Sequence, residues 1–131
     1  MKKVRDQVVP PAAPSPFAAA MMPAGQPDID MITKAVGLTR AQLAAVVGLP
    51  AGTLQTIDAA DAVAMQARVL ELVEIIGRVE SWAGGVPAAM AWYRAQPIPA
   101  FGGRTAEAMV KAGDATAVWR YLDHIAVGGF A

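Results

Sequence analysis

Residues 61–82 read DAVAMQARVLELVEIIGRVESW, a stretch without proline in which Gly77 is the only glycine. Its apolar residues recur at spacings of three and four, which places them on one side of a helix. The stripe consists of Met65, Val69, Leu72, Ile76 and Val79. Val63, Leu70 and Val73 lie beside it and widen the apolar face. The stretch therefore predicts one long helix with a broad buried surface.

Two features inside this stretch carry further expectations. Gly77 in a helix costs about 1 kcal/mol relative to alanine, so it marks either a close crossing by another helix or a simple weak point. Glu74 and Arg78 are spaced i,i+4 in the favourable order, which predicts an ion pair on the exposed side of the helix.

Cap and breaker residues predict shorter helices on both sides of the long one. Asp30 is a candidate N-cap for a helix that ends at Gly37. Thr39 and Gln42 form the pattern of a capping box, and the helix that they open ends at Gly48. A further helix is expected to begin near Pro50, because proline is tolerated in the first turn.

The residues after the long helix predict three more helices. Gly84, Gly85 and Pro87 end the long helix, and 88–95 is the next helical stretch. The loop that follows is rich in proline and glycine (Pro97, Pro99, Gly102, Gly103). Thr105 caps a helix with Glu107 in its first turn, and the last helix runs from about 114 to 127. No segment alternates with period two, so an all-α fold without a sheet is expected.

The first 29 residues have a different composition from the rest. Six prolines fall within residues 1–28, and proline interrupts both helices and central strands. We interpret residues 1–29 as a disordered or extended arm that is not needed for folding. The expected division is this arm, a unit over 30–83 and a second unit over 84–131.

The amino-acid composition argues against several classes of protein function. Eleven basic and eleven acidic side chains give zero net charge, which argues against binding to nucleic acid mainly through phosphate neutralisation. Hydrophobic residues make up 55% of the chain, so either an alanine-rich core or a partner covers apolar surface. There is no cysteine and no apolar run of ~20 residues, and prolines interrupt any signal-like segment. A cytoplasmic protein with no membrane contact is predicted.

The chain lacks the residues that catalysis and metal binding need. His124 is the only histidine, and Ser15 and Ser81 are the only serines. A zinc site takes three or four ligands of the histidine or cysteine type, and a nucleophilic triad needs a histidine beside its serine. Gly102-Gly103 is not followed by the Lys-Ser/Thr of a phosphate loop. A protein that is not an enzyme, with no metal and no cofactor, is therefore expected.

The segment 40–57 has the spacing of two short helices packed at a steep angle. Leu43 and Val47 face inward, Ala44 is small at the crossing, and Gly48 falls in the turn. The second helix supplies its contacts through Leu49, Leu54 and Ile57. This pattern resembles the helix-turn-helix of the Xre-like repressors.

DNA reading by this segment is a separate question. Bases are read mainly by Arg, Lys, Asn and Gln, and the exposed positions of the second helix offer only Gln55 as a strong reader. Two interpretations stay open: a motif kept for packing or dimerisation, and operator binding by a dimer. The candidate DNA-binding residues are Lys34, Arg40, Thr53, Gln55 and Thr56.

The last forty residues, 92–131, read WYRAQPIPAFGGRTAEAMVKAGDATAVWRYLDHIAVGGFA. A tryptophan, a proline, an aromatic residue with Gly-Gly-x-Thr, two short helices and a final glycine follow in order. This resembles the C-terminal toxin-binding domain of the Xre/MbcA/ParS antitoxins. Ala106 departs from the family, which often has proline there. On residue properties alone, Trp92, Pro97 and Phe101 form a small core, while Val118, Leu122 and Ile125 form the buried stripe of the last helix.

The resemblance implies an antitoxin with an N-terminal Xre-like helix-turn-helix bundle, a long linking helix and a small helical toxin-binding domain. Its implied partner is a cognate RES-domain toxin that consumes NAD, and its C-terminal tail would block the toxin's active site. A homodimer that also represses its own operon is expected. The candidate toxin-binding residues are Arg104, Arg120, Tyr121, His124, Val127, Gly128, Gly129, Phe130 and Ala131.

Two other functions stay open. A stand-alone helix-turn-helix transcriptional regulator would need a cationic reading helix, which this sequence lacks. A helical assembly adaptor would use the wide apolar stripe from Met65 to Val79.

Overall fold

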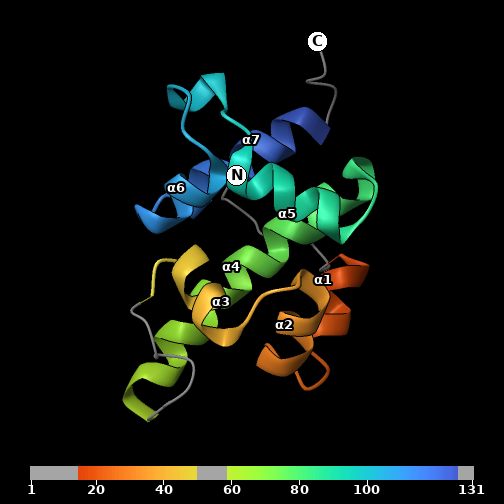
Figure 1. The fold of residues 1–131 in the computed structure, drawn as a ribbon, viewed down its shortest axis with the longest axis vertical. Helices are drawn as coiled ribbons and strands as arrows, with labels where there is room; N and C mark the ends of the chain where they lie inside the picture. The colour runs from red at the N-terminus through yellow and green to blue at the C-terminus, as the bar shows by residue number, and fades with distance from the viewer. Residues whose placement is uncertain (1–14, 50–58, 127–131) are drawn as a thin grey trace, which may run out of the picture.

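The structure, a computed structural model, describes residues 15–49 and 59–126 (Figure 1). Its elements are α1 (Pro16–Met21), α2 (Ile29–Val36), α3 (Arg40–Val46), α4 (Ala59–Ala83), α5 (Val86–Ala95), the 3-10 turn η2 (Pro99–Phe101), α6 (Ala106–Lys111) and α7 (Ala115–Ala126). The described residues hold no strand, only an isolated antiparallel bridge between Ile98 and Arg104. The predicted all-α fold is confirmed.

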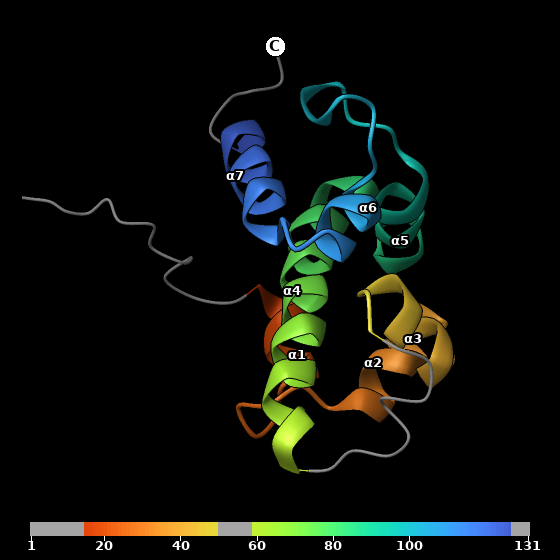
Figure 2. The same cartoon turned by 90° about the vertical axis from the view of Figure 1, so that its left-hand side faces the viewer.

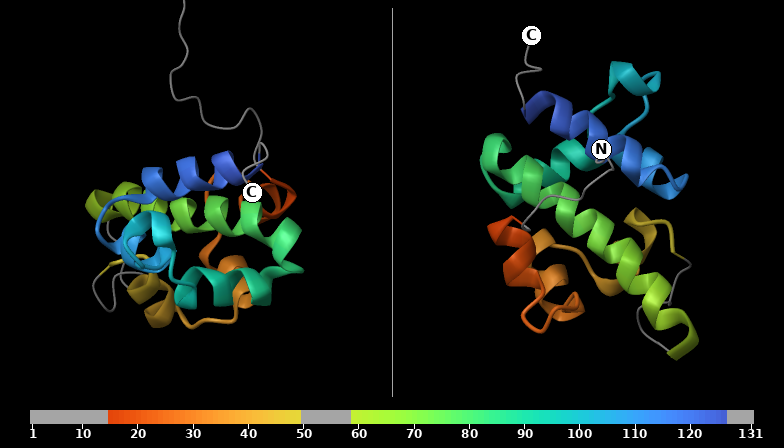
Figure 3. Two further views of the ribbon diagram at one scale, coloured as in Figure 1. Left: turned by 90° about the horizontal axis from the view of Figure 1, so that it is seen from above. Right: turned by 180° about the vertical axis from the view of Figure 1, so that it is seen from behind.

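Helix α4 runs through the middle of the molecule. Figure 2 shows α1 and α7 on one side of it and α2, α3 and α5 on the other. The view from above in Figure 3 shows the same order, with α4 between α7 and α5. The predicted long helix is thus the central element, covered on opposite sides by segments far apart in the sequence.

The core forms one continuous cluster that reaches from Ala18 to Leu122. The predicted stripe of α4 is buried: Val69, Leu72, Ile76 and Val79 are fully enclosed, and Val73 joins them. The side chain of Met65 lies outside the described residues. Because this core continues across residue 83, the proposed division into 30–83 and 84–131 does not coincide with a gap in the packing.

The predicted arm is wrong over Pro16–Met21, which form helix α1. Ser15 caps this helix, since its Oγ accepts a hydrogen bond from the backbone N–H of Ala18 at 3.1 Å. Pro16 occupies the first turn, where its missing N–H removes no helical hydrogen bond. Ala18 and Met21 are buried. Residues 1–14 lie outside the described residues.

Gly77 explains how α1 approaches α4. A Cβ atom at Gly77 would lie 2.0 Å from Ser15 Oγ and 3.0 Å from Ser15 Cβ. The glycine therefore marks a close crossing, the first of the two interpretations of its position. The crossing partner comes from the segment whose prolines had suggested that it contains no helix.

The capping predictions are confirmed in part. The capping box of Thr39 and Gln42 is present, and Gly37 ends α2 in the left-handed conformation. The N-cap of α2 is Asp28, not Asp30, and its carboxylate accepts from the N–H of Met31 at 3.1 Å. The helix starts two residues earlier than expected because Asp28 is the residue with extended backbone.

The first half of the predicted helix-turn-helix packs as expected. Leu43, Ala44 and Val47 are fully buried, and Gly48 has φ = 81°, a conformation suited to a tight turn. Residues 50–58, which include Leu54 and Ile57, lie outside the described residues. The second helix of the motif therefore stays a prediction.

A buried tyrosine ties α5 to α3. Tyr93 is fully buried, and its hydroxyl donates a hydrogen bond to the carbonyl oxygen of Val46 at 2.9 Å. This carbonyl belongs to the last turn of α3, where helical partners are missing. Burial, aided by the Glu107 and Glu71 carboxylates, raises the pKa of Tyr93, so the hydroxyl keeps its proton.

The crossing at Gly77 can be tested by Gly77→Ala. Alanine should gain about 1 kcal/mol of helix propensity, yet the overlap with Ser15 should make the protein less stable by roughly 1–3 kcal/mol. In the Ser15→Gly background, where a glycine cap costs only a few tenths of a kcal/mol, the same change should become neutral or stabilising. Urea denaturation of the four proteins measures this coupling. Equal effects of Gly77→Ala in both backgrounds would contradict the close crossing.

The link between α3 and α5 can be tested by Tyr93→Phe, which keeps the ring and removes the hydroxyl. The Val46 carbonyl would then be left unpaired in the core, and a loss of about 1–3 kcal/mol in unfolding free energy is expected. Tyr121→Phe is the matched control, because the Tyr121 hydroxyl makes no hydrogen bond within the described residues and its loss should be nearly neutral. Similar costs for the two variants would refute the assigned role of Tyr93.

Candidate protein interface

The loop between α5 and α6 is closed on itself. The N–H groups of Ile98 and Gly103 donate to the carbonyls of Arg104 and Ile98, each at 3.0 Å. Ile98 is buried and anchors the loop, whereas Pro97 is exposed. The predicted small core of Trp92, Pro97 and Phe101 is thus wrong at Pro97. The branched side chain of Ile98, the next residue, fills the core instead.

An aromatic contact joins this loop to α7. The rings of Phe101 and Tyr121 lie 5.5 Å apart between centroids, tilted by 58°. Both side chains are half-buried and pack on the core. In Figures 1 and 2 the loop and the C-terminal part of α7 lie at the same end of the molecule. Tyr121 is therefore shared between the fold and the surface and is not a freely exposed side chain.

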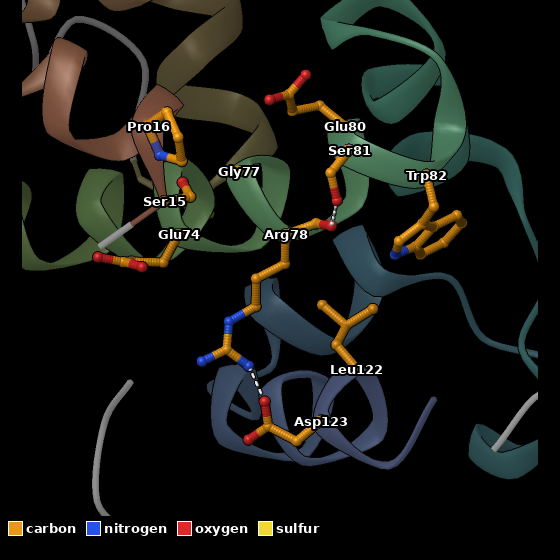
Figure 4. A pocket seen from close by; sticks show the side chains of 10 residues that line it. All are labelled: Ser15, Pro16, Glu74, Gly77, Arg78, Glu80, Ser81, Trp82, Leu122 and Asp123. Carbon is orange, nitrogen blue, oxygen red and sulfur yellow. Dashed lines mark hydrogen bonds and ion pairs between the residues drawn. The ribbon is translucent and has the colours of Figure 1, made fainter. Parts of the chain in front are cut away.

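Arg78 of α4 holds the other flank of α7. Its guanidinium forms an ion pair with Asp123 (Figure 4). It also lies over the ring of Trp119, 5.7 Å from the centroid. The expected pair between Glu74 and Arg78 is wrong, because Arg78 reaches α7 instead. A guanidinium that lies between a carboxylate and an indole face is stabilised by both contacts.

These contacts fix which face of α7 remains outward. Val118 and Leu122 are buried as predicted, and Ile125 is half-buried. Arg120 and His124 are exposed and stand four residues apart on the outer side of the helix. Neither pairs with a carboxylate within 15–49 and 59–126. The remaining toxin-binding candidates of the tail, Val127, Gly128, Gly129, Phe130 and Ala131, lie outside the described residues.

Arg104 lies at the loop end of this face. It is exposed, and its Nε donates to the carbonyl of Phe101 at 3.3 Å. Other cations nearby are already paired, since Glu107 binds Lys111 at 2.7 Å and Arg94 at 3.5 Å. Arg104 has no carboxylate partner in the described part of the chain. Within the described residues, the loop and α7 thus present two guanidinium groups without a carboxylate partner, those of Arg104 and Arg120.

The DNA-binding candidates are only partly described. Lys34 is exposed in the last turn of α2. Arg40 stands at the start of α3, where its Nη2 pairs with Asp30 Oδ1 at 2.5 Å. Thr53, Gln55 and Thr56 lie outside the described residues. A reading surface formed by all five residues therefore stays a prediction.

Several residues of this end of the molecule were not predicted. Asp123 and Trp119 position α7 through Arg78, and Trp82, with 47% of its surface exposed, stacks edge-on against Trp92. No local spacing indicates the pair of Arg78 and Asp123, because the two residues are 45 positions apart.

Two features are absent from the residues that the structure describes: a metal-binding group and a membrane-spanning helix. No group of three His, Cys, Asp or Glu side chains there could hold a metal ion. None of the described helices is long and apolar enough to cross a membrane.

Comparison with known proteins places the interface in a family. Residues 78–128 match the family model described as the antitoxin Xre/MbcA/ParS C-terminal toxin-binding domain. No curated protein and no solved structure matches the chain. The match begins inside α4 at Arg78, the residue that braces α7, and includes the closed loop, α6 and α7. Over residues 78–128, the chain is therefore similar to the toxin-binding domain of the Xre/MbcA/ParS antitoxins.

Proposed function

We propose that the protein is the antitoxin of a type II toxin–antitoxin pair and that it neutralises a cognate RES-domain, NAD-consuming toxin in the cytoplasm. The toxin-binding domain family of residues 78–128 supports a toxin partner and is not a family of enzymes. Inhibition would then be steric, by covering the partner's active site.

The observation that carries the proposal is the bracing of α7 on both flanks. Arg78 holds one flank through Asp123, and Phe101 holds the other through Tyr121. The exposed side chains of Arg120 and His124 are thereby held outward on a fixed helix. Tyr and Arg are enriched among the residues that dominate binding energy at protein interfaces. We propose Arg104, Arg120, Tyr121 and His124 as contacts of the toxin.

The five residues that follow α7 have a separate role in this proposal. Val127 leads into Gly128 and Gly129, and Phe130 is the large apolar residue beyond them. Two glycines allow many backbone conformations, so this tail can adapt to a cavity in the partner. We propose that α7 supplies affinity and that the tail enters the NAD pocket of the toxin.

Dimerisation and repression of the antitoxin's own operon form the second part of the proposal. The buried half of the helix-turn-helix pattern, with Leu43, Ala44 and Val47 in the core, supports a packed motif. Because the chain has zero net charge, one copy would neutralise few phosphates. DNA binding would therefore need two copies that act together.

Operator binding is expected to be weak and to depend on concentration. Residues 50–58 contain no lysine or arginine, so the slope of log affinity against log salt should correspond to few phosphate contacts per copy. Electrophoretic mobility shifts with the upstream region of the gene, at several salt concentrations, measure this slope. Tight binding by a monomer that does not change with salt would contradict it.

Affinity and inhibition should separate in two variants. Removing residues 128–131 should leave the complex with the toxin intact or modestly weakened while restoring much of its NAD consumption. Tyr121→Ala should weaken the complex itself by roughly 2 kcal/mol if the ring is a buried anchor. Calorimetry gives the affinity, and NAD depletion at saturating antitoxin gives the inhibition.

Matched controls make this test specific. Arg120→Ala should weaken binding, whereas Arg94→Ala removes a guanidinium that is paired with Glu107 on α6 and should leave binding unchanged. Tyr121→Phe keeps the contact with Phe101, so it separates the loss of the ring from the loss of the hydroxyl. Full inhibition by the tail-deleted protein at saturation would show that α7 and the loop cover the site alone.

A further inference from the structure

A groove of about 460 Å³ is lined by residues of α1, α4 and α7 together with Ser15. The start of α1, the second half of α4 and one flank of α7 form its walls, and Figure 4 shows the side chains that line it. Ser15 and Pro16 stand at one end, Trp82 at the other, and Gly77 and Leu122 between them. Its volume lies within the range of roughly 300–1,000 Å³ that is usual for ligand pockets.

The groove combines an open aromatic ring with acidic walls. Trp82 is the most exposed large apolar residue of the described chain, at 47%. Glu74, Glu80 and Asp123 also line the groove, and Arg78, its one cation, is bound to Asp123. Burial raises the pKa of Glu74, and the nearby Arg78 offsets this only in part. Three carboxylates and one guanidinium give the described residues of the lining a net charge of −2.

We propose that residues 1–14 of the same chain dock in this groove, with 10–14 lying along it against Trp82 and the basic residues Lys2, Lys3 and Arg5 near its carboxylates. The proposal concerns a surface that the toxin-binding role does not use, and it stands whether or not that role is correct.

The position and length of the segment fit the groove. Residue 14 is joined to Ser15, which forms one end of the groove, so the docked segment is anchored there. Ser15 has φ −61° and ψ 161°, close to the polyproline II conformation, which residues that precede proline favour. In that conformation residues 10–14 span about 15 Å. The helix rise from Gly77 to Trp82 is about 7.5 Å, so five residues cover the groove.

The chemistry of the segment fits as well. Residues 10–14 read PPAAP, and proline-rich segments bind aromatic grooves at low entropic cost because their conformation is already extended. Lys2, Lys3 and Arg5 against Asp6 give residues 1–14 a net charge of +2, which opposes that of the groove. Covalent attachment also gives the segment an effective concentration on the order of millimolar, so weak contacts suffice.

A distance measurement on the full chain tests the proposal. The native sequence has no cysteine, so Val8→Cys and Ala91→Cys allow two spin labels on one molecule, the second at an exposed position of α5. Pulsed electron paramagnetic resonance should show one narrow distance distribution if residues 1–14 are docked. Two changes should abolish the narrow peak: Trp82→Ala, and the triple change Lys2→Gln, Lys3→Gln, Arg5→Gln.

The control is Met31→Ala, which truncates the other exposed large apolar side chain, on α2, and should keep the narrow peak. Thermal melting of every variant verifies folding, and the triple charge change keeps the test valid if Trp82→Ala unfolds. A broad distribution in the parent protein would overturn the proposal. A narrow distance that also arises between singly labelled chains after mixing would assign the groove to a second copy and would overturn it too.

Discussion

Between Val69 and Val79, α4 carries six buried large apolar side chains that form one wide face of the helix: Val69, Leu72, Val73, Ile75, Ile76 and Val79. A helix with so wide an apolar face must be covered by several other elements. Each such side chain contributes roughly 1.5–3 kcal/mol when it is buried, so the order of the whole molecule follows from covering α4. Helices α1 and α7 cover one side, and α5 with the helices beyond it covers the other.

This constraint explains why the buried residues of the toxin-binding segment lie in one cluster with those of the helices before it. The family match starts inside α4, and the face of α4 that α7 leaves uncovered is enclosed by α1 and α5. Tyr93 adds a directional link, because its hydroxyl satisfies a carbonyl at the end of α3. The candidate helix-turn-helix and the toxin-binding segment therefore share one core, and a change in the packing of either alters the stability of both.

The sequence predicted those parts of the fold that depend on local rules. The capping box at Thr39, the left-handed Gly37 and the buried stripe of α4 follow from spacing within one or two turns. Helix α1 was missed because proline was treated only as a breaker, although Ser-Pro is also a good helix start. The ion pair of Arg78 with Asp123 was missed for another reason. The Arg78 guanidinium could pair with the carboxylate of Glu74 or with that of Asp123. Only the packing of α7 on α4 brings Asp123 close to it.

The candidate interface was also predictable only where it depends on local sequence rules. The outward position of Arg120 and His124 follows from the period of α7 and was predictable, but the half-burial of Tyr121 against Phe101 depends on how the loop at Ile98 closes. Immobilising a flexible side chain on binding costs about 0.5–1.5 kcal/mol. Because Phe101 already restricts the ring of Tyr121 and Arg78 already fixes the helix, a partner that binds this face meets side chains ordered in advance. Under the proposed function, this order lowers the cost of association at α7, because the contacts that close the core also restrict the proposed toxin contacts.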